Sequence, residues 1–202
     1  MGKIFYIMGK SSTGKDTIFE KVAENPELNL KHLVMYTTRP IRAKEKDGRE
    51  YYFVDDDAAA KLQRQGKVIE MRSYQTMHGV WKYFTVDDEH TDLEHNDYIA
   101  IGTLESYAKL KEYYGADRIV PIYIEVDDGN RLERALKREK KPQNRKFEEM
   151  CRRFLADAED FSEENLRKAG IDRRFANDND REECMREVEE FIRGCQEGKV
   201  EP

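Results

Sequence analysis

A glycine-rich segment near the start of the chain carries the residue types that bind phosphate. Gly9, Gly14 and Lys15 have the spacing Gly-x4-Gly-Lys, after a short apolar run and before a helix-like pattern. Glycines let successive backbone N–H groups point into one concavity, and the helix that follows adds the positive end of its dipole. Lys15 would offset the negative charge that moves during phosphoryl transfer. The competing interpretation is a turn that only joins a strand to a helix. The predicted phosphate-binding segment comprises Gly9, Lys10, Ser11, Ser12, Thr13, Gly14, Lys15, Asp16 and Thr17.

The residue after the lysine departs from the simplest form of this pattern. That position commonly holds a serine or threonine that binds magnesium, whereas this chain has Asp16, followed by Thr17. A carboxylate also binds Mg²⁺, directly or through water, although it places negative charge beside phosphate. Asp16 is therefore the predicted magnesium ligand.

Two arginines lie in a polar loop further along the chain. Arg39 and Arg42 are three positions apart around Pro40, and Tyr51 follows in the same stretch. A planar guanidinium matches phosphate better than an ammonium does, so two of them on a stiffened loop can hold one phosphate group, with the Tyr51 hydroxyl as a further donor. The alternative is a solvated basic loop, because charge runs usually face water.

A single carboxylate, Glu70, interrupts the apolar run of residues 68–71. On a half-buried strand it can simply face solvent. Alternatively, its two oxygens can accept the paired N–H donors of a nucleobase edge. The sequence pattern leaves both interpretations open.

Residues 137–146 contain six basic residues among ten and are interrupted by Pro142. This composition predicts a lid between two helices that brings Arg138 or Arg145 over a phosphate when it closes. Arg152 and Arg153, on the next helix, can complete an arginine clamp on the transferring group. A surface patch is the alternative, and it is the favoured interpretation for Lys140 and Lys141.

Apolar runs and helical patterns alternate along the chain, and these elements would position the groups above. The alternation favours an α/β fold with a parallel sheet covered on both faces, into which residues 37–96 insert a small mixed lobe. The predicted strands are residues 4–8, 32–36, 68–71, 80–86, 98–101, 119–126 and 174–176. The predicted helices are residues 14–23, 55–65, 104–114, 130–139, 146–169 and 180–195.

The 202 residues predict one domain, with a core of residues 1–36 and 97–202, the lobe of residues 37–96 and a lid at about residues 137–147. The net charge of −6 argues against nucleic-acid or anionic-membrane binding, and no apolar stretch is long enough for a membrane span or signal peptide. We therefore expect a cytoplasmic protein. No metal-ligand spacing connects its histidines and cysteines, so they are interpreted as structural or incidental: His32, His78, His90, His95, Cys151, Cys184 and Cys195.

Residues 3–195 resemble the guanylate kinases, a family of P-loop nucleoside monophosphate kinases. The resemblance rests on a spaced signature that is more specific than the phosphate-binding segment alone: Thr37, Thr38, Arg39, Arg42, Glu45, Gly48, Tyr51 and Phe53. It implies a P-loop NTPase-type parallel sheet, an inserted lobe that binds a nucleoside monophosphate, and a small lid. ATP as co-substrate and Mg²⁺ are implied as well.

The resemblance also implies the roles of individual residues. Glu70 would read the guanine N–H groups, Glu45 would steady the arginine loop, and Asn177 would lie beside the adenine of ATP. The implied acceptor-binding residues are Arg39, Arg42, Glu45, Tyr51, Glu70, Tyr83 and Thr85. The implied ATP-binding residues are Gly9, Ser11, Ser12, Thr13, Gly14, Lys15, Asp16, Thr17, Arg134 and Asn177. The implied catalytic residues are Lys15, Arg39, Arg138 and Arg153.

Four positions depart from the family pattern. A strand that carries two aspartates in the family reads Ile-Ala-Ile-Gly here, so Ala100 and Gly102 replace both acids. Met35 replaces a serine near the base, and Asp16 replaces the hydroxyl residue of the P-loop. One hypothesis is compensation, in which Asp16 supplies the oxygen ligand that Ala100 lacks.

The resemblance implies ATP-dependent phosphorylation of a nucleoside monophosphate, most simply GMP or dGMP. The departures at Met35 and Gly102 keep open a kinase of the same fold with a different acceptor. A third hypothesis is a binding module that retains the fold without catalysis. In each case the expected partners are small nucleotides, and the protein is expected to be a monomer or a homodimer.

Overall fold

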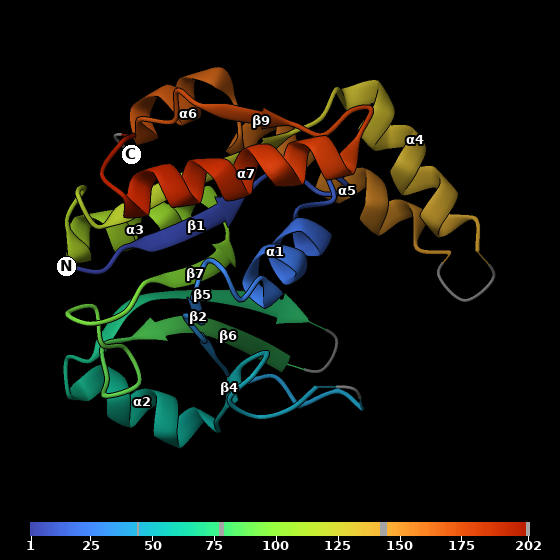
Figure 1. Ribbon diagram of the computed structural model, residues 1–202. Coiled ribbons are helices and arrows are strands. Elements are labelled where there is room, and N and C mark those ends of the chain that lie inside the picture. Colours follow the sequence, from blue (N-terminus) through green and yellow to red (C-terminus); the bar gives the residue numbers. More distant parts are fainter. Residues whose placement is uncertain (44, 77–78, 142–144, 201–202) are drawn as a thin grey trace.

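The computed structural model describes residues 1–43, 45–76, 79–141 and 145–200, which fold around two β-sheets (Figure 1). The strands are β1 (Ile4–Met8), β2 (Lys31–His32), β3 (Tyr36–Thr37), β4 (Tyr52–Phe53), β5 (Val68–Thr76), β6 (Gly79–Val86), β7 (Tyr98–Gly102), β8 (Ile119–Glu125) and β9 (Arg174–Ala176). The helices are α1 (Lys15–Glu24), α2 (Asp56–Arg64), α3 (Leu104–Tyr114), α4 (Asp128–Glu139), α5 (Phe147–Asp160), α6 (Glu163–Ala169) and α7 (Arg181–Gln196).

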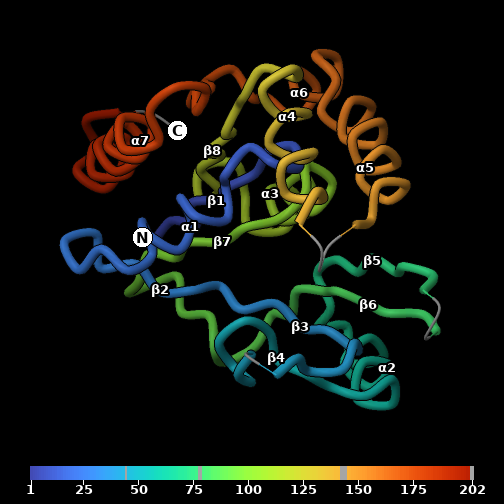
Figure 2. The backbone as a smooth tube through the Cα atoms, turned by 90° about the vertical axis from the view of Figure 1, so that its right-hand side faces the viewer, coloured from blue at the N-terminus to red at the C-terminus, as the bar shows by residue number. Residues whose placement is uncertain are grey.

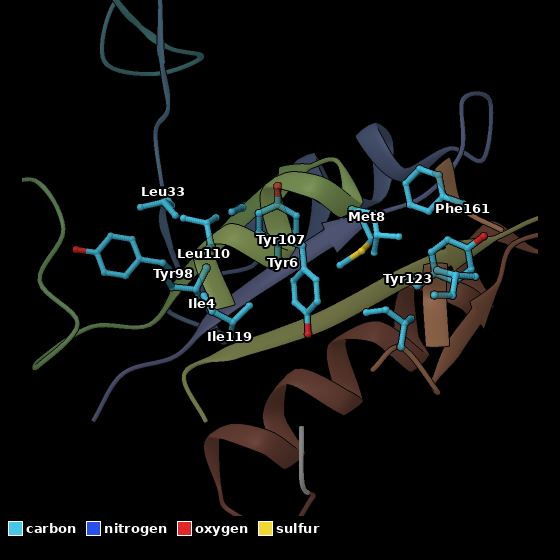
Figure 3. Packing of buried hydrophobic residues seen from close by; sticks show 14 of the residues in the cluster. Ile4, Tyr6, Met8, Leu33, Tyr98, Tyr107, Leu110, Ile119, Tyr123 and Phe161 are labelled. Atoms are coloured by element: carbon cyan, nitrogen blue, oxygen red, sulfur yellow. The ribbon is translucent and has the colours of Figure 1, made fainter. Parts of the chain in front are cut away.

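The five-stranded sheet has the order β2-β7-β1-β8-β9, and its pairings are all parallel. Successive side chains of β1 point to opposite faces. On one face, Ile4, Tyr6 and Met8 form an apolar cluster with residues of α3 and α6, part of which Figure 3 shows. On the other face, Phe5 and Ile7 pack with residues of α1 and α7. The predicted α/β class, a parallel sheet covered on both faces, is confirmed.

The four-stranded sheet has the order β4-β3-β6-β5 and lies beside the first sheet, with α2 on its outer face (Figure 2). Ala59, Phe84 and Val86 form its small apolar core. Asp55 caps α2 by accepting a hydrogen bond from the N–H of Ala58 at 2.7 Å. The boundaries of the inserted lobe and of the lid stay predictions. Lys44 and His78 lie outside the described residues.

Two element predictions are wrong. Residues 32–36 do not form one strand, because the chain leaves the five-stranded sheet after β2 and enters the four-stranded sheet at β3. Residues 146–169 do not form one helical segment either. Buried Phe161 leaves helical geometry, and the Ser162 side chain caps α6 by accepting from the N–H of Asn165, so α5 and α6 are separate helices.

The helices are amphipathic, as α7 illustrates. It buries one apolar stripe against the sheet and turns mostly charged residues outward: the stripe comprises Cys184, Val188, Phe191, Ile192 and Cys195. Both cysteines of this stripe are unpaired, as is exposed Cys151. Within the described ranges, no helix combines the length and apolar character that a membrane crossing requires.

Candidate active site

The carboxyl ends of the parallel strands bring loops together at one edge of the sheet, where ligands bind in open α/β folds. The phosphate-binding segment follows β1, between β7 and β8. Gly14 has a φ of 85° and Ser12 a φ of 67°, the left-handed conformations that curl this loop. A methyl group on Gly9 would lie 2.5 Å from the carbonyl oxygen of Ile124, so only glycine lets the loop approach β8.

Arg131 and Asp157 hold the phosphate-binding segment from outside, and sequence reasoning missed both. The Asp157 carboxylate accepts from the N–H of Ser11 at 2.7 Å and from Arg131 Nη2 at 3.1 Å. Arg131 Nε donates to the carbonyl oxygen of Ser11 at 3.0 Å, and Nη1 bonds the Asp128 carboxylate. The pair therefore binds both polar groups of one P-loop residue. Arg131 is only 1% exposed. Its place on the buried face of a predicted helix, where a charged residue is unusual, is the sequence feature that could have identified it.

Lys15 and Asp16 open α1 beside the curled loop. Lys15 Nζ lies 3.4 Å from Asp16 Oδ2, and the Asp16 side chain is 77% exposed. The described residues include no cluster of three or more His, Cys, Asp or Glu side chains that could hold a metal ion. Magnesium commonly keeps several waters and takes one or two carboxylates plus substrate phosphate oxygens, so one exposed carboxylate at this point fits it.

Three of the residues predicted to bind ATP or catalyse transfer contact the phosphate-binding segment or the loop after β9. Arg138 Nη1 donates to the Ser12 hydroxyl at 3.3 Å. The Asn177 side-chain amide donates to the carbonyl oxygen of Thr13 at 2.7 Å, and Arg134 donates to the carbonyl oxygens of Asn177 and Asp178. The predicted contact of Asn177 with adenine stays a prediction.

Arg153 lies elsewhere, on the exposed side of α5. Arg153 and Arg152 both donate to Glu149, Arg153 at 2.7 Å and Arg152 at 2.8 Å. These bonds, Arg152 first, lower the pKa of Glu149 to about 2. The Arg153 side chain is 58% exposed, so its predicted role at the transferring phosphoryl group requires it to leave Glu149. Pro142, the centre of the predicted lid, lies outside the described residues.

The arginine loop is organised by Glu45. Its carboxylate accepts from Arg39 Nη2 at 2.6 Å and Nη1 at 2.7 Å, and also from the backbone N–H of Arg42. Hydrogen bonding to Glu45 raises the pKa of Arg39 and lowers that of Glu45. The Arg39 guanidinium also lies over the rings of Tyr51 and Phe53. A phosphate that binds Arg39 would thus meet a side chain already fixed in place.

Glu70 is buried, at 7% exposure, on the face of β5 that meets the core. A register shift between Val68 and Glu70 brings Glu70 opposite Thr85 of β6. Glu70 accepts from the hydroxyls of Thr85 at 3.0 Å and Ser106 at 2.9 Å, and from Arg72 Nε at 3.1 Å. The interpretation in which Glu70 faces solvent is therefore wrong. Tyr83, also predicted to bind the acceptor, stacks edge-on to Tyr51 with ring centroids 5.6 Å apart.

Gly102 has no room for a side chain, because Tyr6 packs directly against it. A methyl group there would lie 2.0 Å from the Tyr6 hydroxyl oxygen and 3.0 Å from Cζ of that ring. Tyr6 is fully buried in the β1 core, and burial raises the pKa of its hydroxyl well above the ordinary value. The Tyr6 side chain thus occupies the volume that a residue at position 102 would need.

We expect Gly102→Ala to destabilise the protein by roughly 1–3 kcal/mol, because it overpacks the contact with Tyr6. The double variant Tyr6→Phe/Gly102→Ala should recover part of the loss, since it removes the nearest atom but leaves Cζ. Urea unfolding of both variants, with Tyr6→Phe as the reference, measures this. Full stability of Gly102→Ala would contradict the packing that we describe.

Comparison with known proteins tests the resemblance on which the site assignments depend. Residues 1–194 match the family model described as guanylate kinase. The chain belongs to the guanylate kinase family. The resemblance predicted from the Thr37–Phe53 signature is therefore confirmed, and membership spans nearly the whole chain.

Curated guanylate kinases match parts of the chain. The protein from Porphyromonas gingivalis (strain ATCC BAA-308 / W83) is 31% identical over 126 residues, which cover 61% of this chain and 65% of that protein. The protein from Malacoplasma penetrans (strain HF-2) is 37% identical over 73 residues, 36% of this chain and 37% of that protein. The aligned segments thus span less than two thirds of the curated relatives' length.

Among solved structures, a guanylate kinase from Anaplasma phagocytophilum matches with a TM-score of 0.66 and 21% identity, over 96% of this chain and 85% of that one. At this identity the match concerns the fold. It confirms the predicted P-loop NTPase-type architecture of this guanylate kinase family member. The assignments of individual site residues stay predictions, now supported by the contacts described above.

Proposed function

We propose that this protein transfers the γ-phosphoryl group of ATP to a nucleoside monophosphate, most simply GMP or dGMP. The observation that carries the proposal is the conformation of the phosphate-binding segment, with Gly14 and Ser12 at positive φ and Lys15 at the start of α1. A loop of this shape directs N–H groups at an anion. Family membership supports the reaction class and the choice of acceptor.

In the proposed reaction, ATP lies on residues 9–17 and the acceptor in the lobe of residues 37–96. An oxygen of the acceptor phosphate forms a bond to the γ-phosphorus while the bond from the γ-phosphorus to the bridging oxygen breaks, and ADP leaves. No protein base is required, because the attacking oxygen is already anionic. Lys15, Arg39 and Arg138 neutralise the charge that spreads over the transferring group.

The co-substrate and metal are part of the same proposal. ATP is the expected donor, and Mg²⁺ bound by Asp16 would neutralise charge on the phosphate oxygens. The expected partners remain small nucleotides, with no nucleic acid and no membrane, in a cytoplasmic monomer or homodimer. The sequence charge of −6 supports the exclusion of nucleic acid.

A coupled assay of ADP release tests the function. Purified protein with ATP and magnesium should release ADP at the highest kcat/KM with GMP or dGMP, in a panel that includes AMP, CMP, UMP and dTMP. Preference for another monophosphate would favour the alternative acceptor. If no monophosphate stimulates ADP release, and calorimetry detects GMP binding without ATP binding, the protein is a binding module.

We expect Asp16→Ala to raise the magnesium concentration for half-maximal activity by roughly tenfold or more, since loss of a supporting group typically costs 10-fold to 100-fold in metal affinity. Glu20→Ala, at an exposed position of the same helix, is the matched control. The measurement is a magnesium titration at saturating ATP. An unchanged midpoint would exclude Asp16 as the ligand.

A further inference from the structure

Arg72 forms a buried ion pair with Glu70 on the core-facing side of β5. The two residues are two positions apart on one strand, so their side chains leave the same face of the sheet. Arg72 Nε donates to Glu70 Oε2 at 3.1 Å, and the side chains are 11% and 3% exposed. Sequence reasoning assigned Arg72 no role.

The two oxygens of Glu70 have different partners. Oε1 accepts from the hydroxyls of Thr85 and Ser106, while among the described residues Oε2 accepts only from Arg72. A carboxylate has about four acceptor positions, and a hydroxyl can rotate to another acceptor. Glu70 can therefore accept N–H groups from a ligand without losing its ion pair with Arg72.

The edge of the Arg72 guanidinium that Nη1 and Nη2 form has only weak partners. A guanidinium carries five N–H donors, and one of them bonds Glu70. In the described structure, Nη1 donates to the Thr103 hydroxyl at 3.3 Å and Nη2 to the Met35 sulfur at 3.7 Å. A thioether sulfur is a weak acceptor, so a ligand carbonyl oxygen would form a stronger, charge-assisted bond with this edge.

Through these contacts, Arg72 lies next to positions at which the chain departs from the family pattern. Met35 replaces the expected serine near the base, and Arg72 reaches its sulfur. Thr103 directly follows Gly102, the position without the expected acid. The guanidinium thus lies where the base-reading groups of the pattern are absent, and it offers donors there.

We propose that Arg72 and Glu70 together recognise a base with a lactam edge, a ring carbonyl next to a ring N–H, and that Arg72 is a specificity-determining residue. The inference rests on the proposed kinase function and adds to it the role of Arg72 in reading the acceptor base. Arg72 donates to the carbonyl oxygen, and Glu70 accepts from the adjacent N–H. In guanine these groups are O6 and N1–H, and the 2-amino group is a further donor to Glu70.

The same pair rejects adenine. Adenine presents an amino donor at the carbonyl position and an acceptor at N1, so both groups face a partner of their own kind. A site built to hydrogen-bond a substrate discriminates against an analogue that leaves its buried polar groups unpaired by a factor on the order of 10⁴. The acceptor preference therefore follows the lactam edge, and IMP should remain a substrate while AMP should not.

Steady-state kinetics with GMP and its 6-thio analogue test this pairing. Sulfur is a poor acceptor, so the native protein should favour GMP over 6-thio-GMP. We expect Arg72→Ala to raise KM for GMP about 10-fold to 100-fold, the range of a lost hydrogen bond to a charged group, with KM for ATP unchanged. The variant should also lose the preference for GMP over 6-thio-GMP. Arg64→Ala, an exposed arginine of α2, is the matched control.

Two outcomes would overturn the inference. One is an Arg72→Ala variant that loses activity equally with GMP and 6-thio-GMP, since a merely structural arginine would produce that result; Arg72→Lys provides the comparison if the alanine variant unfolds. The other is a native protein that phosphorylates AMP in preference to lactam bases. If no monophosphate is phosphorylated, the kinase proposal fails, and calorimetric binding of GMP and AMP to the native protein and to Arg72→Ala then decides the pairing alone.

Discussion

The Lys15→Met variant should lose roughly 10²-fold to 10³-fold in kcat, the range for removing one group that stabilises transition-state charge. Lys15 follows the left-handed Gly14 at the start of α1, and its ammonium is bonded only weakly, at 3.4 Å from the exposed carboxylate of Asp16. The Lys15 ammonium group can therefore leave Asp16 and bind the phosphate oxygens of ATP. Methionine retains the apolar part of the side chain, so the loss concerns the charge.

The fold should tolerate this change. Lys21→Met, at an exposed position of the same helix, is the matched control and should retain native kcat. Thermal unfolding of both variants should agree with that of the native protein within about 0.5 kcal/mol, the usual effect of surface substitutions. A Lys15→Met variant with native kcat would remove the proposed donor site from the phosphate-binding segment.

The Asp157→Ala variant should lose roughly 3–5 kcal/mol of unfolding free energy, the cost of leaving one partner of a buried ion pair without the other. Arg131 is 1% exposed and retains Asp128 and the Ser11 carbonyl after the change, so the lower end of this range is expected. The N–H of Ser11 would also lose its acceptor, which loosens the phosphate-binding segment and should raise KM for ATP.

Urea unfolding at neutral pH measures the loss. Asp157→Asn retains a neutral acceptor and should fall between the native protein and Asp157→Ala. Glu164→Ala breaks the exposed pair with Lys168 on α6 and should cost at most about 1 kcal/mol. Losses of similar size for Asp157→Ala and Glu164→Ala would mean that the buried pair does not stabilise the fold.

Local spacing made the conformation of the phosphate-binding segment predictable, while the binding of ATP there stays a prediction. Gly9, Gly14 and Lys15 are close in sequence, and their conformational needs and charge depend on immediate neighbours. The same holds for α3, predicted over residues 104–114 and found there, because Thr103 caps it and Gly115 closes it. Arg39 and Glu45 belong to one short loop, where Glu45 accepts from Arg39 at 2.6 Å, and the acceptor-binding role of both stays a prediction.

Contacts between distant positions were not predictable. Asp157 and Arg131 are on different helices, and the register that turns both toward Ser11 depends on how α4 and α5 pack. Periodicity likewise failed at residues 32–36, where the chain changes sheets, because an apolar run does not specify which sheet it joins. Arg72 was not singled out, because a spacing of two from Glu70 specifies a shared face of a strand but not whether that face is buried.

The contact between Tyr6 and Gly102 limits how the sequence can change over time. An aspartate at position 102 would overlap the packed Tyr6 side chain further than the methyl group of alanine does, so we expect it to cost more stability than Gly102→Ala. A smaller residue at position 6 would make room for it, but that change alone would leave a cavity in the core. An acidic residue at position 102 therefore requires a matching change at position 6. Engineering that restores the acid should begin at position 6.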